Sequence, residues 1–95
     1  MSIREIVERV ESDENFIMLM MDSSKYSFRK DDEDFIIYKN NRIFSAIHVL
    51  SDSSMSVVVA VSREYNTIYR GENTDKAVRC LIGIIKEELG YVENK

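Results

Sequence analysis

The chain has 95 residues, a length that fits one domain built around a single hydrophobic core. Hydrophobic residues make up 44% and charged residues 32%, a balance typical of folded globular domains rather than disordered chains. The net charge of −4 argues against a nonspecific nucleic-acid binder, because binding to phosphates needs a cationic surface.

The single cysteine, Cys80, excludes an internal disulfide framework and favours a reducing compartment. No apolar run approaches the roughly 18 residues of a membrane span, and the N-terminal segment has no secretory signal. We therefore expect a cytoplasmic protein without a membrane partner. With no proline and three scattered glycines, residues 1–95 are expected to form one compact domain without linkers or a phosphate-binding loop.

The first predicted element is a helix near the N-terminus. Ser2 and Glu5 have the spacing of a capping box. Four apolar residues recur at the spacing of one helical face: Ile3, Ile6, Val7 and Val10. The polar residues 13–15 are expected to end this helix.

Six short strands are predicted next, separated by polar spacers of hairpin length. They cover residues 16–21, 25–29, 35–39, 42–50, 55–62 and 66–70. Strand 25–29 is the weakest, and the pair Asn40 and Asn41 suits a two-residue turn, because asparagine tolerates positive φ angles. Short spacers imply antiparallel neighbours, so we predict an α+β fold: an antiparallel meander of five or six strands flanked by an N-terminal and a C-terminal helix.

The C-terminal helix begins at a cap formed by Asn73 or Thr74 and is predicted to end at Gly90. Its apolar stripe consists of Val78, Leu81, Ile82, Ile85 and Leu89. Gly83 lies in mid-helix, where it costs about 1 kcal/mol relative to alanine. It suggests a close approach to the sheet or to another helix, with simple tolerance of glycine as the alternative.

Several of the predicted strands are apolar on both faces, most clearly residues 16–21, which contain three methionines. If the helices cover one face, the other exposes more apolar surface than monomers usually carry, and this favours association. We therefore expect a homodimer, with Met18, Met20, Phe44 and Gly83 in the interface. Methionine suits such a surface because its flexible side chain adapts to irregular partners.

Residues for catalysis are scarce. His48 is the only histidine and lies in an apolar strand, so a catalytic triad or a histidine-rich zinc site lacks companions. The acidic run at residues 31–34 lacks the glycine and ligand spacing of a calcium loop. We expect no enzymatic activity, no cofactor and no metal.

The acidic residues favour a protein-binding role. Six of them are predicted to form one contact surface for a basic patch on a partner: Asp31, Asp32, Glu33, Asp34, Glu8 and Glu11. The resulting hypothesis is a small, non-enzymatic interaction protein, of the kind that phages and mobile elements use to inhibit a host protein. The identity of the protein target does not follow from the sequence.

The alternative is a nucleic-acid-binding module built on the hairpins. Basic and aromatic residues alternate there, as in sheets that bind single strands. The residues that would make this contact are Lys25, Tyr26, Arg29, Lys39 and Arg42.

Overall fold

The computed structural model of the chain describes residues 3–50, 52 and 54–93. The helices are α1 (Ile3–Glu11), α2 (Glu14–Met20) and α3 (Thr74–Glu93). The strands are β1 (Tyr26–Lys30), β2 (Asp34–Lys39), β3 (Arg42–Val49), β4 (Met55–Val61) and β5 (Glu64–Gly71). They form one sheet in the order β1-β2-β3-β4-β5, and every neighbouring pair is antiparallel. The predicted α+β meander between terminal helices is confirmed.

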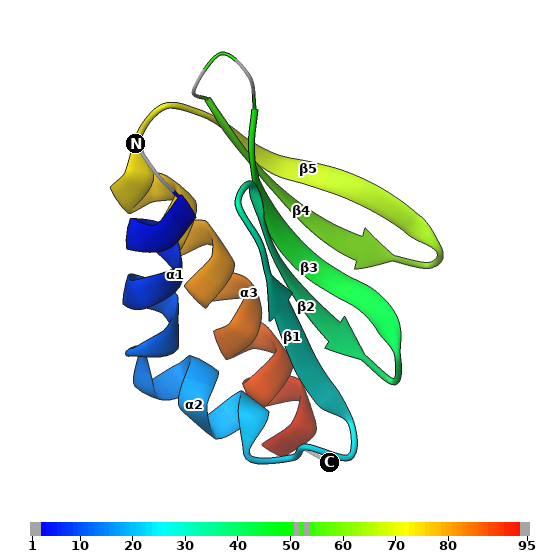
Figure 1. Cartoon of the computed structure of the whole chain (residues 1–95). Helices are drawn as coiled ribbons and strands as arrows, with labels where there is room; N and C mark the ends of the chain where they lie inside the picture. Colours follow the sequence, from blue (N-terminus) through cyan, green and yellow to red (C-terminus); the bar gives the residue numbers. More distant parts are fainter. Residues whose placement is uncertain (1–2, 51, 53, 94–95) are drawn as a thin grey trace.

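All three helices lie on the same side of the sheet (Figure 1). Helices α1 and α2 lie over the β1–β2 end, and α3 packs on β3, β4 and β5. Among the described residues, none of the helices is both long and apolar enough to cross a membrane. The predicted capping residue Ser2 lies outside the described residues.

The first predicted strand, residues 16–21, is wrong, because this segment forms the helix α2. Asp13 caps it by accepting a hydrogen bond of 2.8 Å from the backbone N–H of Asn15. Phe16 and Leu19, three residues apart, are buried against the core, whereas Ile17 is 52% exposed. An uninterrupted apolar run hides helical periodicity, and methionine and leucine are good helix formers.

A cluster of three phenylalanines joins α2 to the sheet. The ring centre of Phe16 lies 5.1 Å from that of Phe28 in β1 and 5.7 Å from that of Phe35 in β2. Phe28 and Phe35 stack at 5.5 Å. Edge-to-face and offset contacts of this kind stabilise beyond the area they bury.

The outer face of the sheet, away from the helices, is less apolar than predicted. One row across it, aligned by strand register, contains Arg29, Ile36, Ala46, Val58 and Thr67. Ile36 and Ala46 are only 6% and 1% exposed although no helix covers them, so neighbouring side chains shield them. These two apolar side chains of the outer face are therefore not bare, although all three helices lie on the other side of the sheet.

Helix α3 begins as predicted, since the side chain of Asn73 accepts a hydrogen bond of 3.1 Å from the backbone N–H of Lys76. Its predicted end at Gly90 is wrong, because the helix continues to Glu93. A Cβ atom added at Gly83 would meet nothing within 4 Å. The sheet and the neighbouring helices in the described chain therefore do not require glycine there.

Two tight turns use positive φ angles. Asn40 and Asn41 have φ of 53° and 65°, which confirms the predicted turn between β2 and β3. The turn between β4 and β5 places Ser62 and Arg63 at φ of 51° and 75°. Serine and arginine carry a Cβ penalty in this region, and turns of this type prefer asparagine followed by glycine.

We expect Arg63→Gly to raise the free energy of unfolding by about 1 kcal/mol, because glycine removes the strain of a positive φ angle. Denaturant unfolding followed by circular dichroism measures this change. Arg70→Gly is the matched control. Arg70 is exposed like Arg63, but it lies within β5 and has no positive φ angle, so glycine should lower stability there. Equal effects of the two substitutions would contradict the assignment of strain to Arg63.

Candidate protein-binding site

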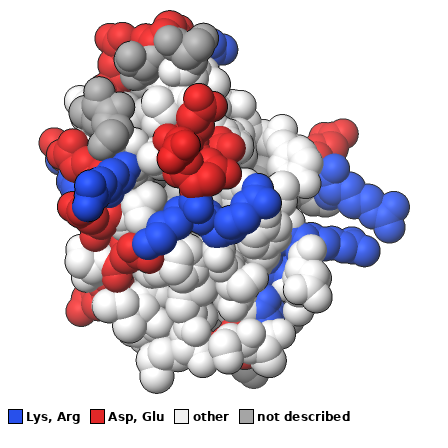
Figure 2. Space-filling view, viewed as in Figure 1, with Lys and Arg blue, Asp and Glu red and all other residues white. Residues whose placement is uncertain are grey.

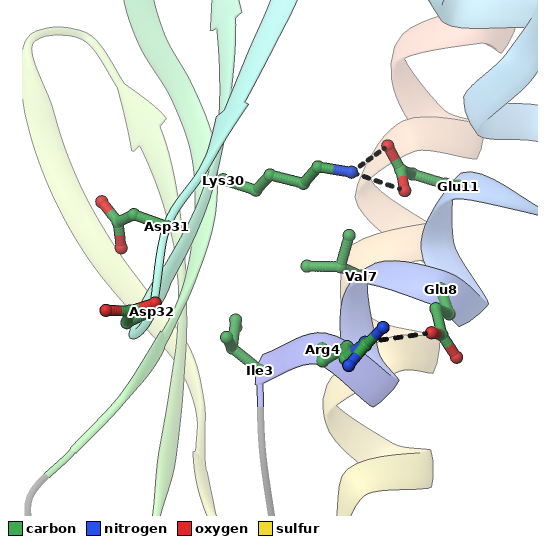
Figure 3. A pocket seen from close by; sticks show the side chains of 8 residues that line it. All are labelled: Ile3, Arg4, Val7, Glu8, Glu11, Lys30, Asp31 and Asp32. Carbon is green, nitrogen blue, oxygen red and sulfur yellow. Dashed lines mark hydrogen bonds and ion pairs between the residues drawn. The ribbon is translucent and has the colours of Figure 1, made fainter.

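A cleft of about 520 Å³ lies between α1 and the turn that joins β1 to β2 (Figure 3). Its lining combines apolar and charged side chains: Ile3, Arg4, Val7, Glu8, Glu11, Lys30, Asp31 and Asp32. Four of the six predicted acidic contact residues therefore meet here, from two segments about twenty residues apart in the chain. Ile3 and Val7, at the floor, are only 7% and 6% exposed.

The acidic side of the cleft is the β1–β2 turn. The carboxylate of Asp31 accepts backbone hydrogen bonds from Glu33, at 3.1 Å, and from Asp34, at 3.0 Å. These two bonds lower the pKa of Asp31, so its carboxylate stays ionised while it holds the turn. Figure 3 shows Asp31 and Asp32 pointing away from α1, outward from the turn that forms the outer edge of the cleft.

Two basic residues cross or border the same cleft. The Nζ atom of Lys30 lies 3.1 Å from both carboxylate oxygens of Glu11, which connects β1 to α1. The Nε atom of Arg4 lies 3.6 Å from a carboxylate oxygen of Glu8. Acidic and basic groups lie next to each other on this face of the molecule (Figure 2). With four acids and two bases in its lining, the cleft remains net acidic.

The remaining two predicted acids differ from each other. Glu33 is exposed in the turn beside Asp32. Asp34 instead contacts the Nδ1 atom of His48 at 2.5 Å, across the β2–β3 register. Asp34 thus belongs to a polar pair within the sheet, and His48 is its half-buried partner.

The five residues of the nucleic-acid alternative do not form one free surface. Tyr26 is only 4% exposed, and its hydroxyl donates a hydrogen bond to Glu88 of α3. The Nζ atom of Lys39 lies 2.7 Å from the same carboxylate. Lys25 places its Nζ atom 5.5 Å from the centre of the Tyr26 ring, whereas Arg29 and Arg42 are exposed elsewhere. Two of the five side chains are thus engaged in a contact between the sheet and α3.

The four residues predicted for a dimer interface lie on three elements. Met20 of α2 and Phe44 of β3 pack against the core. A β-bulge opposite the Ile37–Tyr38 step shifts the register, so Phe44 lies on the helix side rather than on the outer face. Met18 is 48% exposed on α2, and Gly83 lies on α3.

Sequence reasoning missed the apolar floor and the bases of the cleft. The only available signal was the spacing of Arg4 and Glu8, which is that of a helical ion pair. Contact between Lys30 and Glu11 depends on how α1 packs on the sheet, and spacing along the chain does not reveal it. Within the described residues, no three His, Cys, Asp or Glu side chains converge to hold a metal ion.

The Glu88 carboxylate couples stability to pH. Burial raises its pKa, but hydrogen bonds from Lys39 and Tyr26 outweigh burial and leave the pKa below its ordinary value. Burial and the adjacent Glu88 raise the pKa of the Tyr26 hydroxyl, which therefore stays protonated. The ionised carboxylate is thus the state that the fold prefers.

A carboxyl group with a lowered pKa stabilises the fold above its unfolded-state pKa, and this contribution is lost as the pH falls through the folded-state pKa. We expect Glu88→Gln to lower the free energy of unfolding at pH 7 by about 1–2 kcal/mol. We also expect the variant to lose less stability than the wild type between about pH 5 and pH 3. Denaturant unfolding across this pH range measures both effects, and parallel pH profiles would contradict the role of Glu88.

Comparison of the chain with protein-family models, with curated proteins and with solved structures finds no match in any of the three. The cleft itself is therefore the feature that points to a function. Its distinguishing property is the meeting of acids from α1 and from the β1–β2 turn around an apolar floor.

Proposed function

We propose that this protein is a non-enzymatic interaction protein that binds a basic segment of a protein partner in the cleft between α1 and the β1–β2 turn. One observation carries the proposal: four carboxylates and two apolar side chains line the same 520 Å³ cleft. Lysine and arginine side chains have both an aliphatic stem and a charged end, and the cleft offers a surface for each.

The apolar floor suits the stem. Ile3 and Val7 lie between α1 and the β1–β2 turn, and the charged residues surround them (Figure 3). A lysine or arginine side chain of a partner that enters the cleft would cover these two residues. Its charged end, or a neighbouring basic residue of the partner, would then meet the outward-pointing carboxylates of the outer edge.

The charges of the outer edge suit a cationic partner. Asp31 is held ionised by the turn, and Asp32 and Glu33 are exposed beside it. No ion pair involving Asp32 or Glu33 is formed among the described residues. These carboxylates are available to an incoming basic group, and exposed charges of this kind speed association and select the partner.

The same proposal includes a biological role for the protein, as an inhibitor. A small acidic protein that occupies a basic surface blocks whatever else binds there, which is the action of an inhibitor. We place the protein among phage or mobile-element accessory proteins that inhibit a host protein in the cytoplasm. The lone cysteine supports a reducing compartment.

A synthetic peptide of alternating lysine and alanine tests the cleft by fluorescence anisotropy. We expect binding that weakens as salt is added, and a loss of up to roughly fivefold for Asp32→Lys, because an exposed ion pair is worth up to about 1 kcal/mol. Asp32 is preferred to Asp31 because the Asp31 carboxylate also holds the turn.

Glu64→Lys is the matched control, since Glu64 is equally an exposed acid but begins β5, away from the cleft. It changes the net charge by the same amount as Asp32→Lys. If both substitutions weaken peptide binding equally, net charge alone explains the binding and the cleft is not the site.

A further inference from the structure

The hairpin of β4 and β5 extends beyond the helix layer (Figure 1). On the face toward the helices it forms an apolar groove of about 410 Å³ with the exposed side of α3. Val61 and Ile68 line the groove from the hairpin and are 52% and 44% exposed. This end of the sheet therefore has apolar side chains where a helix would be expected to cover them.

On the α3 side of the groove, the residue at the centre is a glycine, which has no side chain. Cys80, Gly83 and Ile84 line it from α3, and a Cβ atom on Gly83 would meet nothing within 4 Å. Nothing in the described chain thus accounts for a glycine that costs about 1 kcal/mol in a helix. A second helix packed against this position would account for the glycine, because glycine lets two helix backbones approach closely.

The charges around Gly83 fit a second copy of the same helix. Arg79 and Glu87 both line the groove, four residues before and four residues after Gly83. Each lies about 6 Å from Gly83 along the helix axis. Both side chains are exposed, and neither forms an ion pair among the described residues.

We propose that two copies of this chain associate through α3, packed antiparallel about a two-fold axis at Gly83. This axis places Arg79 of each copy beside Glu87 of the other and forms two equivalent ion pairs. Such self-complementarity is the property of a two-fold interface. Each α3 also covers the exposed apolar side of the other copy's β4–β5 hairpin, at Val61 and Ile68.

This interface differs from the one predicted from the sequence. It keeps Gly83 but excludes Met18, Met20 and Phe44, which lie on α2 and β3. It also uses no residue of the acidic cleft. Dimerisation and peptide binding can therefore succeed or fail separately.

The charge pair gives the first test, by sedimentation velocity or light scattering over a range of protein concentrations. The wild type should be a dimer, and Arg79→Glu and Glu87→Arg should each weaken it roughly tenfold or more by placing like charges together. The double variant Arg79→Glu with Glu87→Arg should restore the dimer. Arg42→Glu, exposed at the start of β3, is the control and should leave the dimer unchanged.

A monomeric wild type at about 100 μM, well above the micromolar affinity of a specific interface, would overturn the proposal. The proposal would also be overturned by a dimer that neither single charge reversal weakens. It would equally be overturned if the double variant failed to restore the dimer that the single variants lose. Circular dichroism of every variant separates loss of association from loss of folding.

A disulfide tests the position of the axis independently. Cys80→Ser combined with Arg79→Cys and Glu87→Cys places each new cysteine opposite one of the other copy and leaves Gly83 unchanged, so the two copies should join under mild oxidation. In the wild type the two Cys80 residues would lie about 9 Å apart along the helices, too far for a disulfide. Cross-linking of the wild type, or no cross-linking of the variant, would exclude this axis.

Discussion

The packing of Phe16 against Phe28 and Phe35 determines how the chain covers its sheet. With ring centres 5.1 and 5.7 Å from its two neighbours, Phe16 fixes α2 on β1 and β2. Helices α1 and α2 therefore occupy one end of the helix layer and leave the rest of the sheet to α3 (Figure 1). The acidic cleft and the apolar groove lie at opposite ends of this arrangement, one beside α1 and the other beside α3.

Periodicity predicted most of the fold. The four buried residues of α1 follow a helical repeat that polar residues interrupt, and so do those of α3. Four of the six predicted strands match β1 to β4 within one residue at each end, and β5 begins two residues earlier than predicted. Polar residues mark each turn, and Asn40 and Asn41 also tolerate the positive φ angles that their turn requires. Local signals were sufficient wherever polar and apolar positions alternated clearly.

The errors occurred where such contrast was absent. Residues 16–21 are all apolar, so neither the period of a helix nor that of a strand was visible. Asp13 was interpreted as the end of α1 rather than the cap of α2. Phe44 was assigned to the wrong face because a bulge adds one residue to β3, and strand alternation cannot predict a bulge. The candidate site was only partly predictable: the acids were visible, but the pairing of Glu11 with Lys30 and of Asp34 with His48 depends on tertiary contacts.

The β5 strand has a further consequence for the chain at high concentration. It is one of the two edge strands of the sheet and is exposed along most of its length, and such an edge can recruit strands from other molecules into an aggregate. The register shift opposite Val57 and Val58 inserts Ile68 as an extra residue and interrupts the regular ladder. Together with the charges of Glu64 and Arg70, this irregularity protects the free edge against fibril-like growth.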